Sequence, residues 1–333
     1  MTDSRRVVVT QRFFDDATVA YLQAHGCEVA VADLPPGKGD GDFTQAELET
    51  LLAGAAGWIV GHARVTRELM AVLPDLKIVS RRGVGYERVD LEAARDLGKV
   101  VAIAAGGNDA SVADHAIALM LAVGRRFRES QANMLAGNWS ILMGSDLYRK
   151  TVGVVGAGRI GRSVVQRLRG FEAEVLVAGN RRDDAWAAAN DVTYVDMPTL
   201  LARSDVVTLH APLTSETRLL IDAEALAAMK PGAILINTAR GGLVDDAALL
   251  EALKSGRLGG AGLDTFMSES DPALKPVTDA LLALPNVVAT PHAAASSREG
   301  LDRTNRVAAE SVVAVLEGRD PAPGCVVADG RRR

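Results

Sequence analysis

The sequence lacks the features typical of exported, membrane-spanning and metal-binding proteins. It has only two cysteines, Cys27 and Cys325, which lie far apart and form no metal-type pair. Neither a disulfide framework nor a zinc site is expected, and we predict no metal ligands. The most apolar run, residues 116 to 123, is far below the roughly 20 residues that span a bilayer. The start of the chain lacks the long apolar stretch of a secretory signal, so we expect a cytoplasmic protein with no membrane partner.

Positive charge is not in excess either. The 37 Lys and Arg residues are outnumbered by 42 Asp and Glu, for a net charge of −5, and they are scattered along the chain. A polyphosphate backbone would meet no strong opposite field, so nucleic acid is not an expected partner. A length of 333 residues exceeds what one hydrophobic core usually serves, which predicts two domains.

Short β-branched runs alternate with amphipathic helical segments along nearly the whole chain, which is the pattern of parallel sheets covered by helices. The predicted fold class is α/β, with two Rossmann-like domains. We expect residues 1–105 and 294–333 to form a smaller, flavodoxin-like substrate domain, into which a cofactor domain of residues 106–293 is inserted. Strands are predicted at residues 7–10, 28–31, 58–60, 78–80 and 100–103, and in a second series at 151–155, 175–178, 206–210, 234–238, 262–264 and 287–290.

Three glycines follow the first predicted strand of the second series in a Gly-x-Gly-x-x-Gly pattern. Gly156 permits a tight turn, Gly158 lets the backbone approach a pyrophosphate, and Gly161 lets helix and strand pack closely. The helix that begins there offers N–H groups to phosphate. This pattern predicts a nicotinamide dinucleotide site, to which Arg159 and Ile160 of the same turn are also assigned.

The next predicted strand lacks the acidic residue that would hold the ribose 2′-hydroxyl of NAD. Asn180, Arg181 and Arg182 occupy this place after Gly179. Arginines offer charge-assisted hydrogen bonds to a 2′-phosphate, so NADP is favoured over NAD. The alternative is that both arginines are solvated and that an aspartate of the pair at 183 and 184 holds the ribose instead.

Three later strand ends carry the residues that we predict to be catalytic: Arg240, Glu269 and His292. Reduction of a keto acid, the reaction that the resemblance described next implies, leaves an alkoxide that must be protonated and a carboxylate that must be held. His292 is suited to proton transfer near neutrality, and Glu269 would orient its ring. Arg240 would hold the substrate carboxylate and carbonyl oxygen through its planar guanidinium group.

The order of these motifs resembles that of the D-isomer-specific 2-hydroxyacid dehydrogenases, over about residues 58 to 318. The resemblance rests on the glycine triplet, Asn-Thr-Ala-Arg-Gly at 237–241, Asp-x-Phe-x-x-Glu at 264–269 and Pro-His at 291–292. It implies the same three catalytic roles, a small 2-keto or 2-hydroxy acid as substrate, and a homodimer built through the cofactor domain. It also assigns substrate binding to Val84 and Gly85 of an Arg-x-Gly-x-Gly turn, to Arg240 and to His292. Further cofactor contacts are implied for Ala211, Pro212, Thr217, Thr238, Ala239 and Asp264. The alternative for Asp264 is that it caps the turn that follows its strand.

Some positions depart from the family pattern. Serine follows Glu269 where the family often has proline, and Arg64 is displaced from the place expected in phosphoglycerate-specific relatives. A glyoxylate- or hydroxypyruvate-like substrate is therefore favoured, with phosphoglycerate a lesser alternative. The main rival function is that of a corepressor-type protein that senses nicotinamide nucleotides without turnover. Formate dehydrogenase is a lesser alternative, because that relative is expected to have glutamine at position 269.

Overall fold

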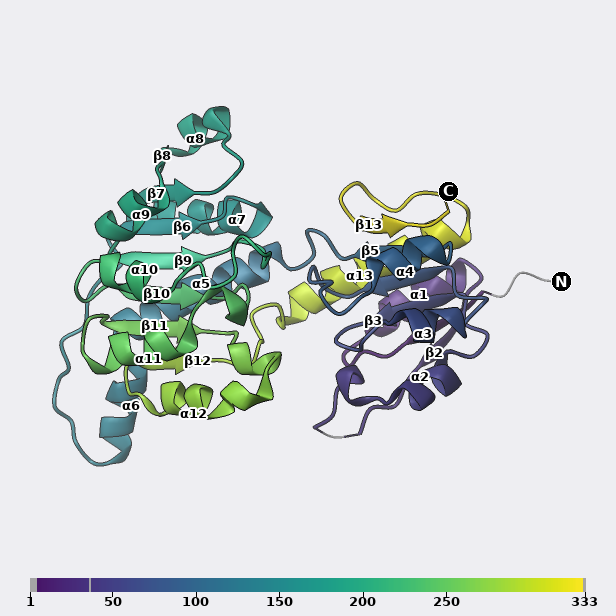
Figure 1. Ribbon diagram of the computed structural model, residues 1–333, viewed down its shortest axis with the longest axis horizontal. Helices are drawn as coiled ribbons and strands as arrows, with labels where there is room; N and C mark the ends of the chain where they lie inside the picture. The colour runs from purple at the N-terminus through teal and green to yellow at the C-terminus, as the bar shows by residue number, and fades with distance from the viewer. Residues whose placement is uncertain (1–4, 36, 332–333) are drawn as a thin grey trace. The chain divides into compact units, whose positions relative to one another are not determined.

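The computed structural model describes residues 5–35 and 37–331. The chain divides into two compact units (Figure 1). The first contains Met1–Asn108 and Ala295–Arg333, and the second contains Asp109–Ala294. The second unit is therefore inserted in the sequence of the first.

The first unit is built on a six-stranded sheet in the order β13-β5-β4-β3-β1-β2. Strands β1 to β5 run parallel in the flavodoxin-like order, and β13 pairs antiparallel with β5 at one edge. The strands are β1 (Arg6–Val9), β2 (Glu28–Val31), β3 (Gly57–Val60), β4 (Ile78–Arg81), β5 (Val100–Ile103) and β13 (Val326–Asp329).

Helices cover both faces of this sheet. Leu22 of α1 and the buried side of α13 join one hydrophobic cluster, whereas α2, α3 and α4 contribute to the other. Local sequence sets where several of these helices begin: Asp15 accepts from the N–H of Thr18, and Thr44 forms a capping box with Glu47. The helices are α1 (Asp16–Ala24), α2 (Gln45–Leu52), α3 (Arg67–Ala71), α4 (Leu91–Asp96) and α13 (Arg298–Leu316), with a 3-10 turn η1 (Asp40–Asp42).

The second unit contains a seven-stranded parallel sheet in the order β12-β11-β10-β9-β6-β7-β8. Counted from its own first strand, this is the Rossmann arrangement, in which the strand order reverses between β6 and β9. The strands are β6 (Thr151–Val155), β7 (Glu174–Ala178), β8 (Val192–Tyr194), β9 (Val206–Leu209), β10 (Ile234–Asn237), β11 (Gly260–Leu263) and β12 (Val287–Ala289).

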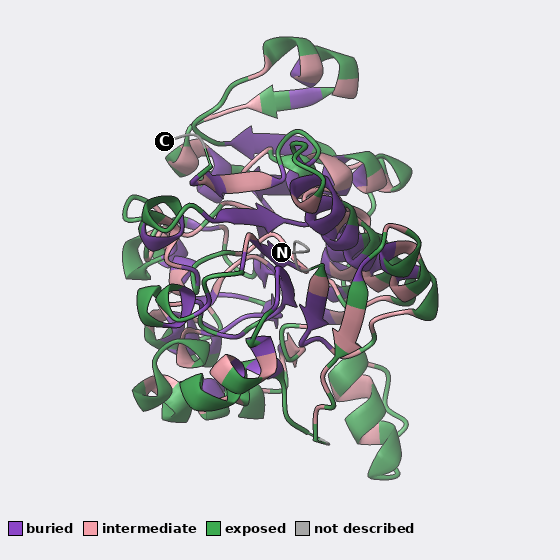
Figure 2. Ribbon diagram, turned by 90° about the vertical axis from the view of Figure 1, so that its right-hand side faces the viewer, coloured by how far each residue is buried: buried purple, intermediate pink, exposed green. Residues whose placement is uncertain are grey.

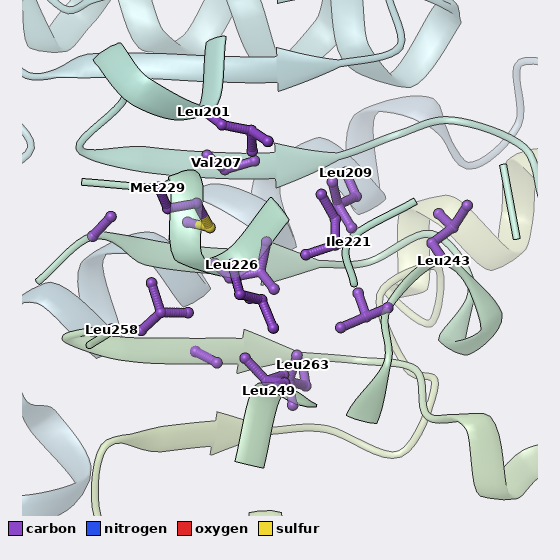
Figure 3. Packing of buried hydrophobic residues seen from close by; sticks show 14 of the residues in the cluster. Leu201, Val207, Leu209, Ile221, Leu226, Met229, Leu243, Leu249, Leu258 and Leu263 are labelled. Atoms are coloured by element: carbon purple, nitrogen blue, oxygen red, sulfur yellow. The ribbon is translucent and has the colours of Figure 1, made fainter. Parts of the chain in front are cut away.

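Each face of the second sheet has its own hydrophobic core. One cluster unites the strands with α9 to α12 and includes Leu209, Leu226 and Leu263 (Figure 3). The other joins them to α5, α7 and α8. Buried residues concentrate on the strands, and exposed residues on loops and outlying helices (Figure 2). The elements are α5 (Asp109–Gly124), α6 (Phe127–Leu135), α7 (Arg159–Leu168), α8 (Asp184–Asn190), α9 (Met197–Arg203), α10 (Ala223–Ala228), α11 (Asp246–Lys254) and α12 (Lys275–Ala283), with η2 (Arg169–Phe171), η3 (Gly241–Leu243), η4 (Met267–Glu269) and η5 (Pro272–Leu274).

The predicted α/β class with Rossmann-like parallel sheets is confirmed. Predicted strand ends differ from the observed ones by at most two residues, but β8 and the antiparallel β13 were not predicted. Cys27 and Cys325 are buried free thiols. Within residues 5–35 and 37–331, no helix has the length and apolar character needed to cross a bilayer.

Candidate functional site

The motifs singled out in the second unit all follow strands of its parallel sheet, so they meet at one edge. The glycine turn follows β6, Asn180–Arg182 follow β7, and Ala211 and Pro212 follow β9. Arg240, Asp264 and His292 come after β10, β11 and β12, which are neighbours in the sheet. Ligands of open α/β sheets bind at this edge, next to the point where the strand order reverses.

The glycine turn between β6 and α7 is shaped by close backbone approaches. Gly156 has φ +96°, and a Cβ on it would lie 2.8 Å from the amide nitrogen of Ala211. A Cβ on Gly161 would collide with the carbonyl oxygen of Gly156. At Gly158, in contrast, no described atom lies within 4 Å of the Cβ position, so the backbone there is open to a ligand. The turn fits a pyrophosphate at the N-terminus of α7.

The other side chains predicted to bind the cofactor differ in the contacts that they make within the chain. Arg159 is exposed and forms a 2.8 Å ion pair with Asp109. Ile160 lies half-buried in the first turn of α7. Thr217 donates a 2.6 Å hydrogen bond to the carbonyl oxygen of Pro212, so it stabilises the loop after β9. The hydroxyl of Thr238 is buried and has no hydrogen-bond partner in the described part of the chain. A buried hydroxyl left unpaired is costly, so a cofactor atom would be a suitable partner for it.

The residues after β7 separate into paired and unpaired groups. Arg182 lies 2.6 Å from Asp184 and stacks over the ring of Tyr194. Asp183 accepts from the backbone of α8 and from Arg162 at 2.8 Å, which holds the pKa of its carboxyl below the ordinary value. Arg181 is exposed, and its side chain makes no hydrogen bond or ion pair with any described residue. Asn180, beside it, is also exposed.

Arg240 is positioned by the side chain of Asn237 at the end of β10. The amide of Asn237 donates to the carbonyl oxygen of Arg240 at 2.9 Å and accepts from the N–H of Ala239 at 3.0 Å. The next residue, Gly241, packs so closely on the backbone of Phe266 that a Cβ would collide with it. The loop that carries Arg240 is therefore locked onto the loop that leads to Glu269.

Glu269 and His292, which the sequence predicted to act together, lie within hydrogen-bond distance of each other. Oε2 of Glu269 lies 2.7 Å from Nδ1 of His292, and Oε1 accepts from the N–H of Phe266 at 2.7 Å. Burial raises the pKa of Glu269, but hydrogen bonds from His292 and Phe266 and the charge of Arg240 bring it below its ordinary value. Glu269 is therefore ionised near neutrality and can hold the histidine ring in one orientation.

Asp264 has no exposed side-chain surface, and both of its oxygens are engaged within the chain. Oδ1 accepts from Thr290 at 2.5 Å and from the N–H of Ala293 at 2.7 Å, and Oδ2 accepts from the N–H of Ala294 at 3.0 Å. From the sequence, Asp264 was expected either to contact the cofactor or to cap the turn that follows its strand. In the structure its carboxylate holds the turn that carries His292.

Several residues in this site were not found from the sequence. Asp246, at the start of α11, accepts from the N–H of Met267 at 3.0 Å and so supports the turn that presents Glu269. Burial raises its pKa to about 6, with added repulsion from Asp245 and Glu269. Acidic residues are common in the first turn of helices, so the sequence alone does not distinguish Asp246 from an ordinary helix-start residue. Its burial in the folded chain does. Thr290 gave no motif signal either.

The predicted substrate residues Val84 and Gly85 belong to the first unit. They follow β4 and are half-buried. The same turn is tied to the end of β5 by a 2.9 Å hydrogen bond from the N–H of Ala104 to the carbonyl oxygen of Gly83. Across residues 5–35 and 37–331, no group of three or more His, Cys, Asp or Glu side chains could hold a metal ion.

Comparison with known proteins gives a consistent result. The family model described as "D-isomer specific 2-hydroxyacid dehydrogenase, NAD binding domain" matches residues 117–294. The chain is 44% identical over 269 residues to a D-3-phosphoglycerate dehydrogenase of Mycobacterium leprae, covering 80% of this chain and 50% of that protein. It is 40% identical over 263 residues to a glyoxylate reductase of Korarchaeum cryptofilum, covering 77% and 78%. The chain thus spans about half the length of the phosphoglycerate dehydrogenases that it matches.

Solved structures agree over nearly the whole chain. A protein of Thermus thermophilus, TT0316, superposes with a TM-score of 0.84 at 39% identity, covering 97% of this chain and 99% of that one. A D-2-hydroxyisocaproate dehydrogenase superposes with a TM-score of 0.83 at 26% identity, covering 97% and 99%.

Proposed function

Because the chain belongs to the D-isomer-specific 2-hydroxyacid dehydrogenase family, we propose that it transfers a hydride between a nicotinamide dinucleotide and a small 2-keto or 2-hydroxy acid. The observation that carries this proposal is the 2.7 Å pair of Glu269 and His292 beside Arg240. These groups share one sheet edge with an open glycine turn suited to the cofactor.

The three side chains have complementary tasks in this reaction. The nicotinamide supplies the hydride in reduction and accepts it in oxidation. His292, whose Nδ1 is held by Glu269, passes a proton from Nε2 to the oxygen of the keto group. The negative charge of Glu269 stabilises the protonated ring before that transfer. Arg240 binds the substrate carboxylate and the polarised carbonyl oxygen, which orients the keto carbon. For Val84 and Gly85 of the first unit we propose a separate task, in which their backbone N–H groups would bind a carboxylate.

NADP is the cofactor that we favour. Asp183 and Asp184 are already paired with Arg162 and Arg182, so neither is poised to receive a ribose hydroxyl. Arg181 makes no such pair with any described residue and can offer its guanidinium to a 2′-phosphate. Other contacts proposed for the dinucleotide are those of Gly156, Gly158, Arg159, Ile160, Gly161, Asn180, Ala211, Pro212, Thr217, Thr238 and Ala239.

We also propose a homodimer formed through the second unit. Large apolar side chains are exposed in α6 and the segment after it, and three of them are at least 83% exposed: Leu135, Ile141 and Met143. Helix α6 has no buried residue in this single chain. Such a concentration of exposed apolar surface is typical of an interface, and a second copy would cover it. The exposed large apolar residues of this segment are Phe127, Met134, Leu135, Trp139, Ile141 and Met143.

The substrate that we favour is glyoxylate or hydroxypyruvate, with 3-phosphohydroxypyruvate as a lesser alternative. The 40% identity to a glyoxylate reductase over 77% of this chain supports a small, unphosphorylated keto acid. The displaced Arg64 also disfavours a phosphorylated substrate.

The test is a panel of 2-keto acids assayed for oxidation of NADPH and of NADH. The panel contains glyoxylate, hydroxypyruvate, pyruvate, phenylpyruvate, 2-ketoisocaproate and 3-phosphohydroxypyruvate. We expect consumption of NADPH with at least one acid, faster than that of NADH. Binding of nucleotide without turnover across the whole panel would overturn the enzymatic proposal and favour a sensing role.

A further inference from the structure

We propose that Thr290 and His115 are positioning residues, which act through Asp264 to hold the turn that presents His292. This inference rests on the proposed function, because it assumes that His292 transfers the proton. None of the sequence motifs includes His115 or gives Thr290 a role. The structure joins them in a chain of hydrogen bonds that runs from α5, past the end of β12, to the end of β11.

Asp264 ties the His292 turn from two sides. Its backbone oxygen accepts from the N–H of His292 at 2.8 Å, and its carboxylate accepts from the N–H groups of Ala293 and Ala294. Three successive backbone N–H groups are thus directed at one residue. His292 has φ +52°, a left-handed conformation that a residue with a side chain adopts only when its surroundings enforce it. The bonds to Asp264 enforce that conformation.

The orientation of the Asp264 carboxylate depends in turn on Thr290. The N–H of Ala294 binds Oδ2, whereas Oδ1 accepts both from the N–H of Ala293 and from the hydroxyl of Thr290, which lies 2.5 Å away. In this hydrogen bond the hydroxyl of Thr290 is the donor and the carboxylate oxygen the acceptor. The oxygen of Thr290 is then available as an acceptor, and Nε2 of His115 lies 2.9 Å from it. The chain therefore has a fixed direction, from Nε2–H of His115 to the hydroxyl and on to the carboxylate.

This arrangement connects the proposed proton donor to a rigid part of the unit. Helix α5 carries Ala116, Leu119 and Met120, which are buried in the core beneath the sheet. His115 is on the same helix, and its Nε2 lies 3.8 Å from Oδ1 of Asp264. Loss of the hydroxyl would leave the carboxylate held by the N–H groups of Ala293 and Ala294 alone, so the turn would hold His292 less closely in the geometry that it shares with Glu269. Cofactor binding at the glycine turn, several strands away, would be unaffected.

The experiment compares two matched pairs of variants in the full chain. Thr290→Val removes the hydroxyl at nearly constant shape, whereas Thr290→Ser keeps it. His115→Leu removes the donor, whereas His115→Gln retains an N–H group of similar reach. Each variant is assayed for kcat and KM with the best keto acid of the panel, for NADPH affinity by fluorescence, and for thermal unfolding.

We expect Thr290→Val to lower kcat by about 10- to 100-fold, the range for a lost hydrogen bond to a charged group, with NADPH affinity changed less than about 2-fold. Thr290→Ser should restore kcat to within about 3-fold of the parent. His115→Leu should lower kcat by a smaller factor, and kcat of His115→Gln should be closer to that of the parent. If the residues act in one chain, the losses in Thr290→Val and His115→Leu should not add in the double variant.

Two controls keep the outcomes separate. If His292→Ala has parental turnover, the proposed function itself fails. If His292→Ala is inactive but Thr290→Val and Thr290→Ser both match the parent, the positioning role is refuted while the function stands. Equal losses in the Val and Ser variants would also refute it, because the hydroxyl would not be the cause. Should Thr290→Val fail to fold, the His115→Leu and His115→Gln pair decides the question by the same criteria.

Discussion

In the second unit, the loops after β10, β11 and β12 are held by more internal contacts than the loop after β7, although all of them lie at the same edge of the sheet. At β10, β11 and β12, the rigid end of this edge, internal hydrogen bonds and backbone packing fix the loops that carry Arg240, Glu269 and His292. Asn237 donates to the Arg240 loop, Asp264 accepts from the His292 turn, and Gly241 packs against the backbone of Phe266. At β7, the residues 179–182 form an exposed loop, and among the described residues its side-chain restraints are those of Arg182.

This difference matches what each end is proposed to do. Hydride and proton transfer require reacting atoms to be held within a fraction of an ångström, because small misplacements are costly in rate. Recognition of a doubly charged phosphate needs an oppositely charged group within reach but tolerates variation in geometry. Changes at the rigid end should therefore affect turnover, whereas changes at the exposed end should affect the choice of cofactor.

The largest effect is expected at His292. Replacing it with Ala should lower turnover by on the order of 10²–10⁴-fold, because the proton donor is lost. NADPH affinity, measured by fluorescence titration, should stay close to that of the parent. A variant with parental turnover would show that the rigid end does not perform the chemistry.

Arg240→Lys should have the next largest effect. A lysine keeps the charge but loses the planar pair of donors, so kcat/KM for the keto acid should fall by about 10- to 100-fold. Arg203→Lys provides a control, because Arg203 forms an exposed ion pair with Glu174 away from the site. The measurement is steady-state kinetics of both variants. Equal kcat/KM values for Arg240→Lys and Arg203→Lys would show that Arg240 does not bind the substrate.

A smaller effect, confined to one cofactor, is expected at the exposed end. Arg181→Ala should weaken NADPH by about 10-fold and leave NADH nearly unchanged, since a charge-assisted hydrogen bond to the 2′-phosphate is lost. Arg182→Ala is the matched control and should change NADPH less, because Arg182 is already paired with Asp184. Equal loss for both cofactors in Arg181→Ala would contradict the assignment.

The smallest effect concerns stability rather than activity. Burial lowers the pKa of His210, which follows β9, from 6.5 to about 4. As the pH falls below about 6.5 the unfolded chain takes up a proton that the folded chain does not, so the unfolding free energy should fall between about pH 6.5 and 4. His210→Gln should flatten this part of the curve in denaturant titrations. Parallel curves for the parent and His210→Gln would refute this account.

The sequence was sufficient to predict the frame of the fold. Alternation of β-branched runs and helices predicted both sheets, and the glycine triplet marked the turn after β6. The strands β8 and β13 were missed because Val192–Tyr194 is too short to show a pattern and Val326–Asp329 pairs with a strand more than two hundred residues away. Long-range pairing leaves no local signal.

For the candidate site, the sequence predicted residue types but not how their hydrogen bonds would be used. Motif order predicted Glu269 and His292 as a pair, and the structure places them 2.7 Å apart. It could not show that the carboxylate of Asp264 would be used within the chain, or that Arg162 would engage Asp183. Those contacts depend on side chains from separate elements, which only the folded chain brings together.

The most direct test of the central claim is the configuration of the product. The full chain would be incubated with NADPH and pyruvate, hydroxypyruvate or phenylpyruvate, and the 2-hydroxy acid would be resolved by chiral chromatography. The account predicts formation of the D-isomer, matched by an equal amount of oxidised cofactor. Formation of the L-isomer would contradict it.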